Sequence, residues 1–82
     1  MTLEELKSSP FVVGLKETER SLERNEAVHV FLASDCDERI SAPLREKCKE
    51  AGVAVTDAYT KKELGHACAI KVKAAAAAVL KK

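Results

Sequence analysis

Short apolar runs alternate along the chain with segments of helical periodicity. The run "PFVVG" (residues 10–14) predicts a brief strand that Gly14 closes, and "AVHVFLA" (residues 27–33) is rich in β-forming residues. Because residues 27–33 are almost wholly apolar, we expect this strand to be covered on both faces. The segment "VAVTDAY" (residues 53–59) predicts a second buried strand.

Helical patterns lie between these runs. Residues 2–9 predict a short amphipathic turn or helix, and residues 16–25 predict a helix, with Asn25 as its C-cap. Residues 34–39, "SDCDER", are typical of a turn.

A third predicted helix follows this turn. Ser41 is suited to cap it, Pro43 is tolerated in its first turn, and Gly52 ends it. Thr60 and Glu63 have capping-box spacing, which predicts a fourth, short helix with Gly65 near its end.

The alanine-rich end of the chain is ambiguous. Helix propensity alone favours a helix for residues 73–82. A central strand between two helical layers would also suit small side chains. The alternation of strands and helices predicts an α/β protein, a compact α/β/α sandwich forming one domain over residues 1–82.

The composition narrows the possible functions of this 82-residue chain. Phe11, Phe31 and Tyr59 are its only Phe, Tyr or Trp residues, so stacking of bases on aromatic platforms is not expected. No apolar run approaches the roughly 20 residues that cross a bilayer, and the N-terminus does not resemble a signal peptide. We therefore expect a cytoplasmic protein with no membrane partner.

Charge is unevenly distributed despite a net charge of +1. Residues 1–59 carry 8 basic and 12 acidic side chains, whereas residues 60–82 carry 6 lysines and 1 glutamate. Two interpretations of the basic C-terminal third stay open, a local contact with an anionic partner and a solvated surface.

Enzyme motifs are absent from the sequence. It contains no GxGxxG or Walker loop, no GxSxG and no HExxH. His66, Cys68 and Cys36 match no metal-ligand spacing, and the three cysteines are expected to be reduced and buried. Asp35 and Asp37 lie beside a turn and are expected to start a helix or to be solvated. We expect a protein that is not an enzyme and that has no cofactor and no bound metal.

The stretch "VGLKETER" is the strongest candidate for a binding site. A glycine directly before a helix lets backbone approach a ligand, and the first-turn N–H groups favour phosphate. Lys16 and Arg20 are i,i+4 neighbours with Glu17 beside them. A carboxylate between two cations fits a guanine edge, but it also fits an ordinary surface ion-pair patch.

The chain also resembles a known family. The segments "VGLKETERSLERNEAVHVFLASDCD", "AGVAV" and "KKELGHACAIKV" look like those of the ribosomal protein seven-Ae/thirty-e family, whose members bind RNA kink-turns. The resemblance covers about residues 12–80 and is greatest to the short bacterial members. It implies a three-layer α/β/α sandwich with a mixed four-stranded central sheet, and it implies a strand for residues 75–80.

The resemblance also implies roles for individual residues. Lys16, Glu17 and Arg20 occupy the positions that read guanines of tandem sheared G·A pairs. The other implied RNA-binding residues are Gly14 and Leu15, through close backbone approach, Lys61 and Lys62, at phosphates, and Ile70, Lys71 and Val72, over the extruded bases.

Four positions depart from the family pattern. Lys16 stands where archaeal and eukaryotic members usually have Asn, and Lys71 stands where Glu is frequent. Ala69 and Asn25 each replace a common glycine.

The functional hypothesis is a monomeric RNA-binding protein that stabilises kink-turns and is ribosomal or ribosome-associated. Its expected partner is structured RNA, with ribosomal RNA and a riboswitch both left open, and no small-molecule substrate is expected. The alternative is a protein-interaction scaffold of the same fold that has lost RNA binding.

Overall fold

The computed structural model describes residues 1–81; Lys82 lies outside the described residues. Helices and strands alternate along the chain. In order they are α1 (Leu3–Lys7), β1 (Phe11–Val13), α2 (Leu15–Glu23), β2 (Ala27–Leu32), α3 (Glu38–Ala51), β3 (Ala54–Thr56), α4 (Lys61–Ala67) and β4 (Ala76–Leu80).

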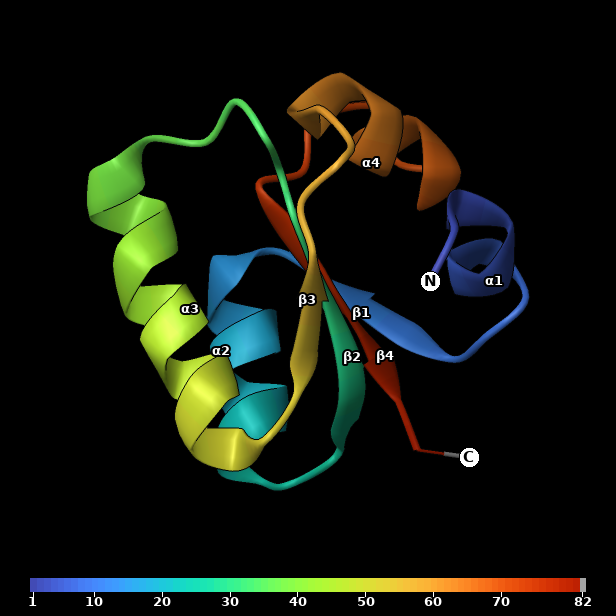
Figure 1. Cartoon of the computed structure of the whole chain (residues 1–82). Helices are drawn as coiled ribbons and strands as arrows, with labels where there is room; N and C mark the ends of the chain where they lie inside the picture. The colour runs from blue at the N-terminus through green and yellow to red at the C-terminus, as the bar shows by residue number, and fades with distance from the viewer. Residues whose placement is uncertain (82) are drawn as a thin grey trace.

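The four strands form one mixed sheet in the order β1-β4-β2-β3. β4 runs antiparallel to both of its neighbours, whereas β2 and β3 are parallel. Helices α2 and α3 cover one face of the sheet, and α1 and α4 cover the other (Figure 1). The predicted three-layer sandwich with a mixed four-stranded sheet is therefore confirmed.

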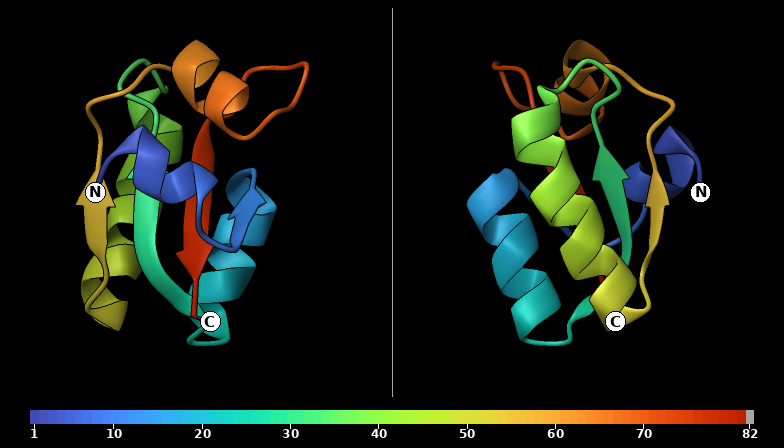
Figure 2. Two further views of the ribbon diagram at one scale, coloured as in Figure 1. Left: turned by 90° about the vertical axis from the view of Figure 1, so that its right-hand side faces the viewer. Right: turned by 60° about the vertical axis from the view of Figure 1, so that its left-hand side comes forward.

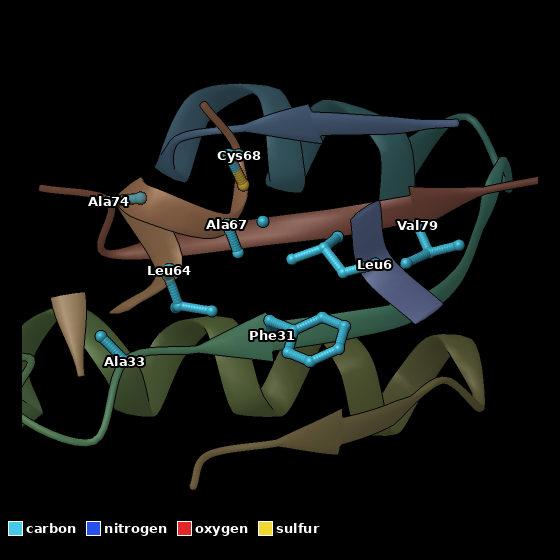
Figure 3. Close-up of a cluster of buried hydrophobic side chains, with 9 residues drawn as sticks. Leu6, Phe31, Ala33, Leu64, Ala67, Cys68, Ala74 and Val79 are labelled. Atoms are coloured by element: carbon cyan, nitrogen blue, oxygen red, sulfur yellow. The ribbon is translucent and has the colours of Figure 1, made fainter. Parts of the chain in front are cut away.

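A hydrophobic cluster fills each space between the sheet and its helices. The cluster under α1 and α4 includes Leu6, Phe31, Leu64 and Val79 (Figure 3). The other, under α2 and α3, includes Leu22, Val30, Leu32, Leu44 and Cys48. Phe31 and its neighbours Val30 and Leu32 belong to opposite clusters, as the alternation of side chains along a strand requires.

The alanine run is a strand. Ala76 and Ala78 contact the α2 and α3 side, and Ala77 contacts the α1 and α4 side. All three are 0% exposed. Pairing with a strand on each edge and burial on both faces override the helix propensity of the sequence. The strand prediction for residues 75–80 is confirmed, with β4 starting at Ala76.

The predicted start of the third helix is wrong. α3 begins at Glu38, and its N-cap is Asp37, whose carboxylate accepts a hydrogen bond from the Arg39 N–H at 2.8 Å. Ser41 is a buried residue inside the helix. Pro43 is consequently beyond the first turn, where its ring leaves the Arg39 carbonyl without the usual helical donor. Asp37 does start a helix, as expected.

Two strands differ from their predictions in length or in burial. β3 covers only Ala54–Thr56 and forms an edge of the sheet, with Ala54 exposed. In β2, Val28 is 47% exposed beside an irregularity in the pairing with β4, so only the second half of this strand is covered on both faces.

His29 is half-buried in β2, where its Nε2 lies 2.6 Å from the Thr56 hydroxyl. Burial lowers the pKa of this imidazole, and the nearby N-terminal amino group lowers it further.

The end of α2 also differs by one residue. Its C-cap is Arg24, and Asn25 follows with a φ of 56°. Asn is among the residues that adopt this left-handed conformation most readily, which explains why it replaces glycine here. Within residues 1–81, no helix has the length and apolar character needed to span a membrane.

Candidate nucleic-acid interface

The start of α2 is an open helix N-terminus. Its N-cap is Gly14, with φ of 102° and ψ of 160°, and glycine has no side chain to occupy the first-turn N–H groups. This φ favours glycine over any other residue. Leu15 is half-buried against the cluster under α2 and α3, so its side chain anchors the start of the helix.

Lys16, Glu17 and Arg20 are all exposed on α2. Arg20 Nη1 lies 3.3 Å from Glu17 Oε1, and about half of each side chain is accessible to solvent. A solvent-exposed pair of this kind contributes at most about 1 kcal/mol to stability. Glu17 and Arg20 can therefore give up this contact at little cost and bind a ligand instead.

The opposite side of α2 fixes the helix to the sheet. Thr18, Ser21 and Leu22 are buried, and Ser21 Oγ donates to the Thr18 carbonyl at 2.7 Å. The Thr18 hydroxyl is fully buried and has no hydrogen-bond partner among residues 1–81. The exposed trio thus stands on a rigidly packed helix.

A hydrogen bond connects this helix start to the first residue of β4, directly after the loop between α4 and β4, residues 68–75. The Gly14 N–H donates to the carbonyl of Ala76, the first residue of β4, at 2.8 Å. The left view of Figure 2 shows the α4–β4 loop projecting at the same end of the molecule as the start of α2. Two predicted segments that are distant in sequence are therefore neighbours.

The α4–β4 loop exposes apolar and basic side chains. Val72 is 71% exposed, and Lys71 and Lys73 are also exposed. Ile70 is half-buried and packs against the cluster under α1 and α4. Of the predicted loop residues, Val72 and Lys71 are free to contact a ligand, while Ile70 mainly anchors the loop.

Two residues shape this loop. Ala69 has a φ of 58°, and it directly follows the end of α4. The Ala69 N–H donates to the His66 carbonyl and the Ile70 N–H donates to the Gly65 carbonyl, each at 3.1 Å. These two bonds form a Schellman motif, the left-handed helix ending that usually contains glycine. A Cβ on Gly65 would overlap the Val72 carbonyl oxygen, so the loop lies directly against α4.

Lys61 and Lys62 begin α4. Thr60 and Glu63 form the predicted capping box, in which Thr60 Oγ1 accepts from the Glu63 N–H and Glu63 Oε1 accepts from the Thr60 N–H. Lys62 is exposed, whereas Lys61 is half-buried. The Lys61 carbonyl accepts a hydrogen bond from the Ala74 N–H at 3.1 Å, which ties the start of α4 to the end of the loop.

Sequence reasoning missed two contributors. The Asp35 carboxylate accepts from the Lys61 N–H at 2.9 Å and so joins the β2–α3 turn to α4. Lys73 belongs to a surface hollow beside the loop, which we call the loop hollow. It is lined by Lys62, His66, Ile70, Lys71, Val72 and Lys73. Nothing in the local pattern around Asp35 indicated a partner 26 residues away, whereas the charge run of the C-terminal third did include Lys73.

The three residues weighed as a metal site have different environments. Cys68 is buried, and burial raises the pKa of its thiol; burial likewise raises the pKa of Cys48. Cys36 is half-buried, and His66 is exposed. In the part of the chain that the structure describes, no three His, Cys, Asp or Glu residues gather in a way that could hold a metal ion.

Comparison with known proteins gives consistent results. An RNA-binding protein of Geobacillus sp. (strain WCH70) is 42% identical over 76 residues, which is 93% of each chain. The large ribosomal subunit protein eL8 of Halobacterium salinarum is 41% identical over 68 residues, covering 82% of this chain and 57% of that protein. The 15.5 kDa RNA-binding protein of Giardia lamblia has a similar structure, with a TM-score of 0.84 and 26% identity over 98% of this chain and 68% of the other.

The names of these relatives are those of RNA-binding and ribosomal proteins, in agreement with the expectation that the chain is not an enzyme. The model of the ribosomal protein L7Ae/L30e/S12e/Gadd45 family matches residues 2–82, almost the entire sequence. This chain therefore belongs to the ribosomal protein L7Ae/L30e/S12e/Gadd45 family.

Proposed function

We propose that this protein binds structured RNA and stabilises its kink-turns. The observation that carries the proposal is the Gly14 N–H bond to Ala76, which holds the exposed trio of α2 beside the α4–β4 loop. The helix start that would read guanines then lies on the same side of the molecule as the loop, which carries both apolar and basic side chains. The relatives named as RNA-binding proteins support RNA as the partner.

The start of α2 would read the tandem sheared G·A pairs. Glu17 accepts hydrogen bonds from a guanine amino or imino group, and Lys16 and Arg20 donate to guanine acceptors or to phosphates. Gly14 and Leu15 allow close approach of backbone to RNA. Because Lys16 carries an ammonium instead of an amide, it contributes a charge as well as a hydrogen bond at this step.

The second segment would hold the extruded bases and the backbone. Val72 offers apolar contact to bases, together with the part of Ile70 that lines the loop hollow, and Lys71 makes this loop more basic. Lys61 and Lys62 supply positive charge for phosphates at the start of α4. Because the half-buried Lys61 has less freedom than Lys62, Lys62 is the stronger phosphate contact.

Stabilising a kink means binding the bent RNA better than the extended RNA. Such a protein shifts the RNA conformational equilibrium by its difference in affinity for the two states. The match with a ribosomal protein over 82% of the chain supports a ribosomal or ribosome-associated role.

The test is a titration against two RNAs at one stated salt concentration. One is a kink-turn duplex, and the other is the same duplex with Watson–Crick pairs replacing the G·A pairs. We expect tight binding to the first and weak, strongly salt-dependent binding to the second. Equal affinity for both RNAs would contradict kink-turn recognition, and no binding to either would favour the protein-interaction alternative.

A further inference from the structure

A second hollow adjoins the loop hollow on the other side of α4. We call it the α1–α4 hollow; it is lined by Leu3, Lys7, Lys62, Glu63, His66 and Ala67. Lys62 and His66, one helical turn apart on α4, line both hollows. The left view of Figure 2 shows α1 lying beneath α4, on the side away from the α4–β4 loop.

The α1–α4 hollow combines cationic edges with an apolar floor. Leu3 and Ala67 are the apolar lining residues, and both belong to or pack against the cluster beneath these helices. Lys7, Lys62 and His66 supply N–H donors around them. Glu63 contributes one carboxylate, which accepts hydrogen bonds from the Thr60 N–H and hydroxyl, so the lining carries two lysines against one glutamate.

Lys7 is available to a ligand. Its ammonium lies 3.7 Å from Glu4, but 45% of the Lys7 side chain and 87% of the Glu4 side chain are exposed. Such a pair is weak and easily exchanged. A phosphate arriving at Lys7 would therefore displace little.

We propose that an RNA arm leaving the kink continues across α4 into the α1–α4 hollow, where its phosphates contact Lys62, His66 and Lys7 and its ribose surfaces lie on Leu3 and Ala67. This inference rests on the proposed function. The α1–α4 hollow is continuous with the loop hollow and has a positively charged edge. Its occupant is therefore expected to be a polyanion and not an apolar peptide segment. Lys7 thereby extends the RNA interface to the N-terminal helix.

The test compares Lys7→Gln with Lys49→Gln. Lys49 is an exposed lysine in the last turn of α3, on the opposite layer of the sandwich, so it serves as the matched control. Three RNAs are titrated: a kink-turn with two long arms, and the same kink-turn with one or the other arm shortened. Affinities are measured at several salt concentrations.

For the long-armed RNA, we expect Lys7→Gln to weaken binding about threefold to tenfold and to reduce the salt slope by about 1, the effect of losing one phosphate contact. The loss should vanish when one particular arm is shortened and persist when the other is shortened. Lys49→Gln should bind like the unchanged protein.

A second variant separates RNA contact from the stability of α1. Glu4→Gln removes the same ion pair but keeps the cation, so we expect it to retain full affinity. An equal loss in Glu4→Gln and Lys7→Gln would overturn the inference, as would a Lys7→Gln effect that does not depend on either arm. Kink-turn binding by the unchanged protein with no Lys7 effect would refute only the inference, whereas no kink-turn binding at all would refute the proposed function as well.

Discussion

Glu17 is held by Arg20 before any ligand arrives, at 3.3 Å on the exposed side of α2. This pair gives the carboxylate a preferred position. Binding of a guanine edge would then exchange a weak, solvated contact for a hydrogen bond in a drier environment, where it is stronger.

For Glu17→Ala, we expect a loss of about 1 to 3 kcal/mol in binding to kink-turn RNA, the range for a good contact to a base edge. The variant should also discriminate less between RNA with G·A pairs and RNA with Watson–Crick pairs. Parallel titrations of both RNAs measure the two effects.

The control for this experiment is Glu46→Ala, which removes an exposed glutamate from α3. It changes the net charge equally and should leave discrimination intact. If Glu17→Ala and Glu46→Ala improve binding to both RNAs by the same factor, Glu17 acts only through its charge and not as a reader.

Ala69 is a strained residue, because its φ of 58° puts a Cβ in the left-handed region. That conformation costs roughly 1 to 2 kcal/mol for a residue other than glycine. For Ala69→Gly, we expect the free energy of unfolding to rise by about 0.5 to 1 kcal/mol, since glycine's extra freedom in the unfolded chain cancels part of the relief.

Denaturant unfolding measures this change. Ala58→Gly is the matched control, because Ala58 is exposed and does not have a positive φ. It should lower the free energy of unfolding. A decrease in both variants would show that the backbone at Ala69 is not strained.

At the scale of elements, α4 and the loop after it behave as one unit. The Schellman motif, the Ala74–Lys61 hydrogen bond and the close approach at Gly65 all join the two segments. The position of Val72 and Lys71 is therefore set by α4 more than by the loop's own sequence.

Gly65→Ala tests this coupling. In an isolated helix the change would stabilise by roughly 1 kcal/mol, but here the new Cβ would overlap the Val72 carbonyl oxygen. Because backbone must move to relieve this overlap, we expect a net loss of about 1 to 3 kcal/mol in the free energy of unfolding. RNA affinity should fall as well, through displacement of residues 70–73.

Backbone chemical shifts of residues 70–73 identify the displaced segment. Lys49→Ala, a change on α3 in the opposite layer of the sandwich, should leave those shifts unchanged. A Gly65→Ala protein that is more stable than the original would show that the helix and loop are not in close contact.

Local signals predicted the element types better than their limits. Capping at Thr60 was correctly read because it depends on residues three apart. The start of α3 was predicted wrongly, because Ser41 and Asp37 are both good N-caps and a start at Ser41 would place Pro43 in the first turn, where proline is tolerated. The short, exposed β3 could not be foreseen, because position at the edge of a sheet is a property of the topology.

At the scale of the whole molecule, the basic C-terminal third of the sequence contributes to one region of the surface. Three lysines of the C-terminal third, Lys62, Lys71 and Lys73, line the loop hollow. Lys62 lies at its junction with the α1–α4 hollow. We therefore expect Lys62→Ala to weaken binding to all RNAs alike and to flatten the salt dependence by about 1.

Titrations over a range of salt concentrations, with kink-turn and Watson–Crick RNAs, check this prediction. Lys49→Ala is the control for charge alone. A Lys62→Ala protein that loses affinity only for the kink-turn RNA would mean that Lys62 reads structure and not simply phosphate.

The fold class was predictable, but the alanine strand was not predictable from its own residues. The propensity of residues 73–82 indicated a helix, and only the resemblance to a family indicated a strand. The space available decides between helix and strand for the alanine run. The position between β1 and β2 requires a strand with small side chains on both faces. That requirement belongs to the assembled molecule.

The hydrogen bond from Gly14 to Ala76 has a consequence for folding. β4 pairs with β1 and β2, segments far from it in the sequence, so the sheet is complete only after long loops have closed. The same docking of β4 brings the start of α2 beside the α4–β4 loop. The surface proposed to bind RNA is therefore assembled by the step that completes the sheet, and hydrogen exchange at the Gly14 amide should report on both events at once.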